Sequence, residues 1–189
     1  MSDYRITQDD LDWLQRLIKP TDRVILSPGP LLEIREVPVK DQPGPGGSTY
    51  QKPEGLWYAC GDEWLRFLTE EMGGSELLAG VAFAYLIKVR HSDMAVIRTA
   101  GELDDFELTY STSPSGREGS IDWSLVSAGT TGIEICPYIG SRRMRDWYYT
   151  WDVASGCIWD PSAVSSIVQV FAEGERPGRR GPKAEFPPT

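Results

Sequence analysis

The apolar and polar positions near the start of the chain have the spacing of an amphipathic helix. Apolar side chains recur every three or four positions after Thr7, and Thr7 and Asp10 have the spacing of a capping box. This pattern predicts a helix over residues 7–18, which Pro20 ends because the residue before a proline avoids helical geometry. The same reasoning predicts further helices at Asp62–Met72, Gly101–Tyr110 and Ile121–Ala128.

Other segments alternate between apolar and polar residues or form short apolar runs, and these are predicted strands. They are Leu31–Val37, Leu56–Cys60, Val81–Val89, Met94–Arg98, Gly132–Cys136, Cys157–Trp159 and Val164–Phe171. A turn at His91–Asp93 predicts a hairpin between its two neighbouring strands, and Arg142–Trp151 is predicted to be a turn that runs into a strand. Short strands and short helices without regular alternation predict an α+β fold with twisted, antiparallel-rich sheets.

Composition divides the chain into a body and a tail. Residues 1–172 are predicted to form a single mixed α+β domain, because 40% of the chain is hydrophobic and its length suits one domain. Residues 173–189 are rich in proline and glycine and poor in apolar residues, so we expect a disordered tail.

The excess of acidic over basic residues disfavours some classes of binding partner. The 189 residues include 28 acidic and 19 basic ones, a net charge of −9. Duplex nucleic acid and anionic membranes are therefore poor partners, since both are polyanions. No apolar run approaches the ~18 residues of a membrane span. The acidic N-terminus does not have the pattern of a signal peptide, and Cys60, Cys136 and Cys157 show no CxxC motif and an odd count. These features predict a cytoplasmic protein without a disulfide framework.

The single histidine, His91, excludes several kinds of chemistry. One histidine cannot form an HExxH motif or a two-histidine zinc site, so no metal site is predicted. The chain also contains no P-loop, no GxGxxG and no GxSxG elbow before a helix. We expect His91 to be an exposed residue of a turn.

Two clusters combine aromatic rings with charged residues. The first, Lys52–Trp64, contains Trp57 and Tyr58 after a flexible loop, and the second, Arg142–Asp160, places arginines among aromatic residues. Arginine beside aromatic rings is typical of cation–π stacking and anion binding. The alternatives are that the rings form the core and that the arginines lie on an exposed edge.

The second cluster carries a family resemblance. GIEICPY at 132–138 and SGCIWDPSAVSSI at 155–167 resemble the closing strands of the ADP-ribosyltransferase fold in bacterial toxins and phage proteins. The resemblance implies NAD as cofactor, with Arg35 on a phosphate or ribose. It also implies that Trp57 or Tyr58 stacks on the nicotinamide.

The chain departs from that family at the catalytic position, where Ser155 stands in place of a glutamate. Cleavage of the nicotinamide–ribose bond needs a carboxylate to hold the ribose 2′-OH and to stabilise an oxocarbenium-like transition state. Asp152 and Glu134 are the candidate catalytic residues. The resemblance and the clusters together give the candidate cofactor-binding residues Arg35, Trp57, Tyr58, Arg143, Trp151 and Ser155.

Three functions remain open at this point. The resemblance implies an ADP-ribosyltransferase-like, toxin-like enzyme that binds NAD and modifies an acceptor such as a host protein. The pattern KPxGLW…WYYTWDVASGCIWD also resembles small phage and actinobacterial proteins, for which no activity follows. The alternative is therefore a non-enzymatic module that binds a nucleotide-type small molecule or a protein, such as a phage-encoded inhibitor. The third is a structural or assembly protein with a rigid aromatic core.

Overall fold

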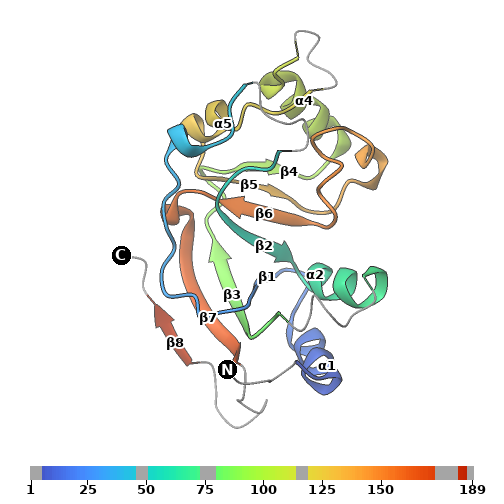
Figure 1. Ribbon diagram of the computed structural model, residues 1–189, viewed down its shortest axis with the longest axis vertical. Helices are drawn as coiled ribbons and strands as arrows, with labels where there is room; N and C mark the ends of the chain where they lie inside the picture. Colours follow the sequence, from blue (N-terminus) through green and yellow to red (C-terminus); the bar gives the residue numbers. More distant parts are fainter. Residues whose placement is uncertain (1–5, 46–50, 73–79, 114–118, 173–182, 187–189) are drawn as a thin grey trace. The chain divides into compact units, whose positions relative to one another are not determined.

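The computed structural model describes residues 6–45, 51–72, 80–113, 119–172 and 183–186. The chain divides into two compact units. The first unit takes Met1–Ile34, Tyr58–Val89 and Val164–Thr189, and the second takes Arg35–Trp57 and Arg90–Ala163. Both combine short helices with strands, and most of the described strand pairs are antiparallel, which confirms the predicted α+β class (Figure 1).

The first unit contains an antiparallel sheet. Strand β1 (Arg23–Ser27) pairs on one side with β2 (Leu56–Cys60) and on the other with β3 (Phe83–Val89). Strand β3 also pairs with β7 (Val164–Ala172), which pairs in turn with β8 (Lys183–Phe186). The predicted strands at 56–60, 81–89 and 164–171 are thereby confirmed.

Helix α1 (Gln8–Leu17) confirms the predicted first helix. The Asp10 N–H donates to the Thr7 hydroxyl at 3.2 Å, and the Thr7 N–H donates to the Asp10 carboxylate at 2.9 Å. This capping box satisfies donors that the first helical turn leaves open. Leu11 and Leu14, one turn apart, are buried, so the helix covers the core of the first unit with its apolar stripe.

The predicted helix at 62–72 is a short α-helix that continues as a π-helical turn. Helix α2 (Glu63–Arg66) leads into Phe67–Glu71, and both Leu65 and Leu68 are buried. These two leucines join residues of α1 and of the sheet in one hydrophobic cluster. The spacing of three residues keeps them on the same side.

The second unit contains a short mixed sheet and two helices. Strand β4 (Ala95–Ile97) runs parallel to β5 (Gly132–Ile135), which pairs antiparallel with β6 (Ser155–Ile158). Between β4 and β5 the chain forms α4 (Ala100–Tyr110) and α5 (Trp123–Gly129). A long helical connection of this kind is what parallel strands require. All residues of β5 and β6 are buried, as expected for a sheet covered on both faces.

Two predicted strand arrangements are wrong. Residues 31–37 form no strand, although they alternate, and Leu32 is 84% exposed. The strand lies earlier, in the apolar run of β1, which pairs with a strand on each side. The predicted hairpin between 81–89 and 94–98 is also absent, since β3 pairs with β1 and β7 while β4 pairs with β5.

The tail and the cysteines differ from expectation where the structure describes them. Within 173–189 the structure describes only Lys183–Phe186, which form β8, and the other residues of the predicted tail lie outside the described ranges. Cys60 and Cys136 are disulfide-bonded, and Cys157 is a buried free thiol. The cysteines therefore give no support to a reducing compartment. Among the described helices, none has the length and apolar character of a membrane span.

Candidate functional site

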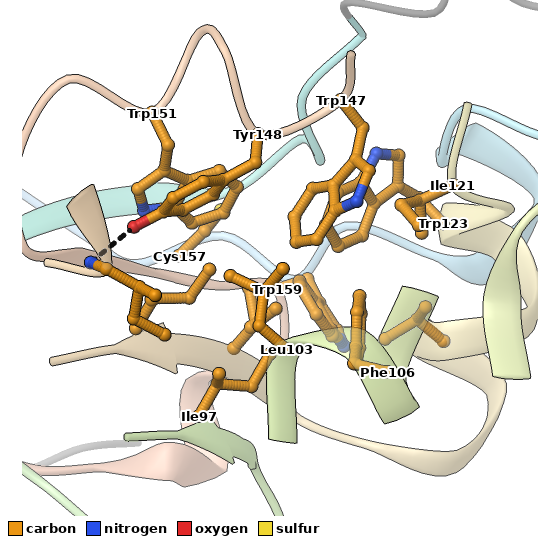
Figure 2. Close-up of a cluster of buried hydrophobic side chains, with 14 residues drawn as sticks. Ile97, Leu103, Phe106, Ile121, Trp123, Trp147, Tyr148, Trp151, Cys157 and Trp159 are labelled. Atoms are coloured by element: carbon orange, nitrogen blue, oxygen red, sulfur yellow. Dashed lines mark hydrogen bonds between the residues drawn. The ribbon is translucent and has the colours of Figure 1, made fainter. Parts of the chain in front are cut away.

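The arginine- and tryptophan-rich segment forms the core of the second unit. Trp147, Tyr148 and Trp151 are at most 1% exposed, and they pack with Trp123 of α5. Ring centroids lie 6.0 Å apart between Trp147 and Trp123, and 6.2 Å apart between Tyr148 and Trp151. Figure 2 shows Trp147 and Trp123 next to Phe106, with Tyr148 and Trp151 stacked on each other beside them. The interpretation of the aromatic residues as core therefore holds for this segment.

The local backbone explains why these rings share one side. Residues 142–151 form turns instead of the predicted strand, and the Tyr149 N–H donates to the Arg145 carbonyl at 2.7 Å. Helix-like turns place positions i, i+1 and i+4 on one face, whereas a strand would point neighbouring rings in opposite directions. The Ile139 N–H donates to the Tyr148 hydroxyl at 3.0 Å, and burial raises the pKa of Tyr148.

Two arginines of the same segment are engaged by helix α4. Arg142 donates from Nε and Nη2 to the two carboxylate oxygens of Asp104, at 2.8 and 2.6 Å. Arg145 donates to the Glu107 carboxylate at 2.7 Å and to Asp104 at 3.2 Å. The hydrogen bond with Asp104 raises the pKa of Arg142. These bidentate contacts hold the turn segment against α4. Arg143, one of the two arginines predicted to bind the cofactor, is exposed.

Two of the predicted site residues, Trp57 and Asp152, lie near Lys52, and a third, Trp151, packs against Trp57. The Lys52 ammonium lies 5.1 Å from the centre of the half-buried Trp57 ring, which contacts Trp151 with centroids 4.9 Å apart. Burial lowers the pKa of Lys52, and the negative charge of exposed Asp152 acts in the opposite direction. The arrangement is a cation–π contact with a carboxylate in its neighbourhood.

A close main-chain approach positions this segment. A Cβ atom on Gly55 would overlap the Ile158 carbonyl oxygen and lie 2.8 Å from the Cys157 sulfur. Only glycine allows the chain before β2 to lie so close to β6. Burial raises the pKa of the Cys157 thiol, so this cysteine stays protonated and inert near neutral pH.

Glu134, the second candidate acid, is a buried residue of β5. Its carboxylate lies 3.0 Å from Nε2 of His91, whose side chain is 35% exposed. The pair joins a buried carboxylate to a partly exposed imidazole. Contacts of this kind occur in catalytic acid–base pairs and also in purely structural roles. His91 is in a turn, as the sequence predicts, and its ring is engaged by Glu134.

The other predicted residues lie apart from this group. Ser155 is buried, and its hydroxyl donates to the Val153 carbonyl at 3.0 Å. Tyr58 is buried in the first unit, and Arg35 is exposed at the start of the second. The structure therefore brings together Trp57, Trp151 and Asp152, and places the remaining candidates elsewhere.

A groove of about 350 Å³ lies beside this core, between β4 and α4. Its floor contains Ile97 and Phe106, which are buried. Its helical wall carries the exposed side chains of Glu102, Asp105 and Thr109. The full lining consists of Ala95, Val96, Ile97, Glu102, Asp105, Phe106, Thr109, Tyr110 and Thr130. The groove combines an apolar base with a negatively charged rim.

The sequence alone did not identify the acidic residues of α4 that pair with the arginines or those that line the groove. Asp104 and Glu107 are spaced by three residues on α4, which marks one helix face, and Glu102, Asp105 and Thr109 mark another. This spacing was a usable signal for two charged faces. Lys52 precedes the aromatic run, but nothing in the sequence places its ammonium over the Trp57 ring.

No protein-family model, no curated protein and no solved structure matches the chain significantly. The resemblance to ADP-ribosyltransferases and the use of NAD stay predictions from the sequence.

Proposed function

We propose that the protein is a non-enzymatic module that binds a positively charged segment of another protein in the groove between β4 and α4. The observation that carries the proposal is the combination of an apolar base, at Ile97 and Phe106, with exposed carboxylates at Glu102 and Asp105. Lysine and arginine suit such a groove, because their alkyl stems cover apolar surface while their charged ends reach carboxylates.

Residues at the start of α4 keep the groove negatively charged. The Arg98 and Thr99 N–H groups donate to Oε2 of Glu102 at 2.6 and 2.9 Å, and these bonds lower the pKa of Glu102. Glu102 is therefore anionic at neutral pH, and Asp105 extends the charge along the helix. The net charge of −9 adds a long-range attraction for a cationic partner.

The burial of two tryptophans and the ion pairs of two arginines in the turn segment count against these four residues as a nucleotide site, which favours a protein ligand. Stacking on a base or nicotinamide needs an accessible ring face, and binding a phosphate needs an available cation. Trp147 and Trp151 are buried in the core, and Arg142 and Arg145 pair with carboxylates of α4.

A second candidate is the NAD-cleaving enzyme, which the group around Lys52 favours. Half-buried Trp57 and exposed Asp152 are the residue types that nicotinamide stacking and oxocarbenium stabilisation require. In this alternative Asp152 holds the ribose 2′-OH, and nicotinamide is released. The two candidates differ in a simple readout, since only the second produces free nicotinamide.

A charge-reversal experiment tests the proposal. The probe is a fluorescein-labelled short peptide of alternating lysine and threonine, whose anisotropy is followed at low ionic strength. Asp105→Lys should raise Kd by about 10-fold or more, because it replaces an attractive charge with a repulsive one in the groove. Glu71→Lys makes the same change of net charge at an exposed position of the first unit, and it should alter Kd by less than about 2-fold.

Equal weakening by both substitutions would mean general charge attraction and would contradict the groove. Absence of peptide binding to the wild-type protein would contradict the proposal as well. Nicotinamide release from NAD by the wild type that Asp152→Asn abolishes would replace the proposal with the enzyme.

A further inference from the structure

The outer edge of β4 has main-chain groups that face the groove. In the part of the chain that the structure describes, β4 pairs with β5, and the Ile97 carbonyl accepts from the Cys136 N–H at 3.2 Å. Main-chain groups of successive strand residues point to opposite edges. The N–H and C=O of Val96 therefore point away from β5, and Val96 lines the groove.

Hydrogen bonds of the neighbouring N–H groups leave one residue of this edge, Val96, to pair with an added strand. The Met94 N–H donates to the His91 carbonyl at 3.3 Å, and the Arg98 N–H donates to Glu102 at 2.6 Å. A segment that adds to β4 must therefore form its paired hydrogen bonds at Val96. This sets the register of such a segment before any side chain is considered.

Helix α4 provides the opposite wall of the groove. Glu102, Asp105 and Thr109 recur at helical spacing, so their side chains lie along one face over two turns. Ile97 of β4 packs with Leu103 and Phe106 of α4, so α4 covers one face of the sheet at this edge. A strand added beside β4 in the plane of the sheet would direct every second side chain to the face that α4 covers. A carboxylate-bearing helix face therefore favours a segment in which every second residue is basic.

We infer that the cationic segment binds in extended form, as an additional strand whose main chain pairs with the N–H and C=O of Val96. The inference rests on the proposed function, because the carboxylates of Glu102 and Asp105 determine which segment enters. Main-chain pairing supplies affinity, and the alternate basic side chains supply specificity. The Arg98 guanidinium acts on Glu102 and competes with the incoming cation, so Asp105 is the stronger determinant of the two.

Main-chain methylation of the probe tests strand addition without changing the protein. Two versions of the lysine–threonine peptide are compared with the parent: one carries N-methyl groups on all lysines, the other on all threonines. In an added strand only one of these sets of N–H groups points toward β4. One version should lose binding by about 10-fold or more, while the other keeps the affinity of the parent within about 2-fold.

The outcomes separate the inference from the proposed function. If both methylated peptides bind as the parent does and Asp105→Lys still weakens binding, strand addition is overturned while the proposed function stands. If both lose binding equally, a strand paired along one edge is also overturned. If the parent peptide does not bind, the proposed function fails and the inference fails with it.

A substitution on the protein gives a second reading. Val96→Pro removes the N–H group that the added strand would use, and it should weaken the parent peptide by about 10-fold while the circular dichroism spectrum is unchanged. A folded Val96→Pro variant with the wild-type Kd would overturn the pairing at this residue. Methylated peptides decide the question if this variant does not fold.

Discussion

The core of the first unit is mainly aliphatic and is covered by helix α1, whereas the core of the second is rich in aromatic rings and depends on a segment of turns. Leu11 and Leu14 reach the first core from a capped helix, as their sequence spacing predicts. Trp147 and Trp151 reach the second from residues 142–151, where two salt-bridged arginines hold the backbone. Periodicity specifies the first core, and contacts between distant residues specify the second.

Truncation of a fully buried tryptophan gives the sharpest test of this contrast. Trp147→Ala should lower the free energy of unfolding by about 3–5 kcal/mol, measured by urea denaturation, because it opens a large cavity among rings. Leu14→Ala in the first unit should cost about 2–5 kcal/mol by the same mechanism.

A matched ring substitution separates packing from hydrogen bonding. The Trp147 indole N–H has no hydrogen-bond acceptor among the described residues, so Trp147→Phe keeps a ring and loses no bond. It should cost less than half of what Trp147→Ala costs. Equal losses for both variants would contradict an account based on packing.

A smaller effect is expected where α4 holds the turn segment. Glu107→Gln removes the charge that pairs with Arg145 in a buried position, and it should cost about 1–3 kcal/mol. The control is Asp105→Asn on the exposed face of the same helix, which should stay within about 0.5 kcal/mol of the wild type. If the two variants are equally stable, the ion pair does not hold the segment, and the contrast between the two cores weakens.

The smallest expected effect is a pH dependence at the start of α4. The pKa of Glu102 is lowered in the folded state by main-chain hydrogen bonds from Arg98 and Thr99. Its contribution to stability is therefore present above the ordinary pKa of a glutamate and is lost as the pH falls through the lower, folded value. The Tm difference between wild type and Glu102→Gln should shrink between about pH 5 and about pH 3. A difference independent of pH would contradict this assignment.

The share of the structure that can be predicted from the sequence differs between the two units, and the reasons are physical. Local signals suffice for α1, where Thr7 and the leucine spacing agree, and for the short apolar strand at 56–60. They fail at 31–37, which form no strand although the Val37 N–H donates to the Trp159 carbonyl, and at 142–151. The turns of the second segment depend on Asp104 and Glu107, which lie about 40 positions earlier in the chain.

The candidate site shows the same division. Trp57, Trp151 and Asp152 are grouped by the structure much as the aromatic clusters suggest, although Trp151 faces the core. The groove was not predicted, because β4 was expected in a hairpin with its preceding strand. Its parallel pairing with β5 depends on the packing of two helices, which a pattern within one strand does not encode.

Hydrogen exchange with the lysine–threonine peptide tests the central claim most directly, since it reports where on the chain the peptide binds. The account predicts slower amide exchange in β4 and α4 when the peptide is present, and unchanged exchange in α1 of the first unit. The Asp105→Lys variant should show neither change. Protection confined to the segment around Lys52 and Trp57, or protection in α1 equal to that in β4 and α4, would contradict the groove as the binding site.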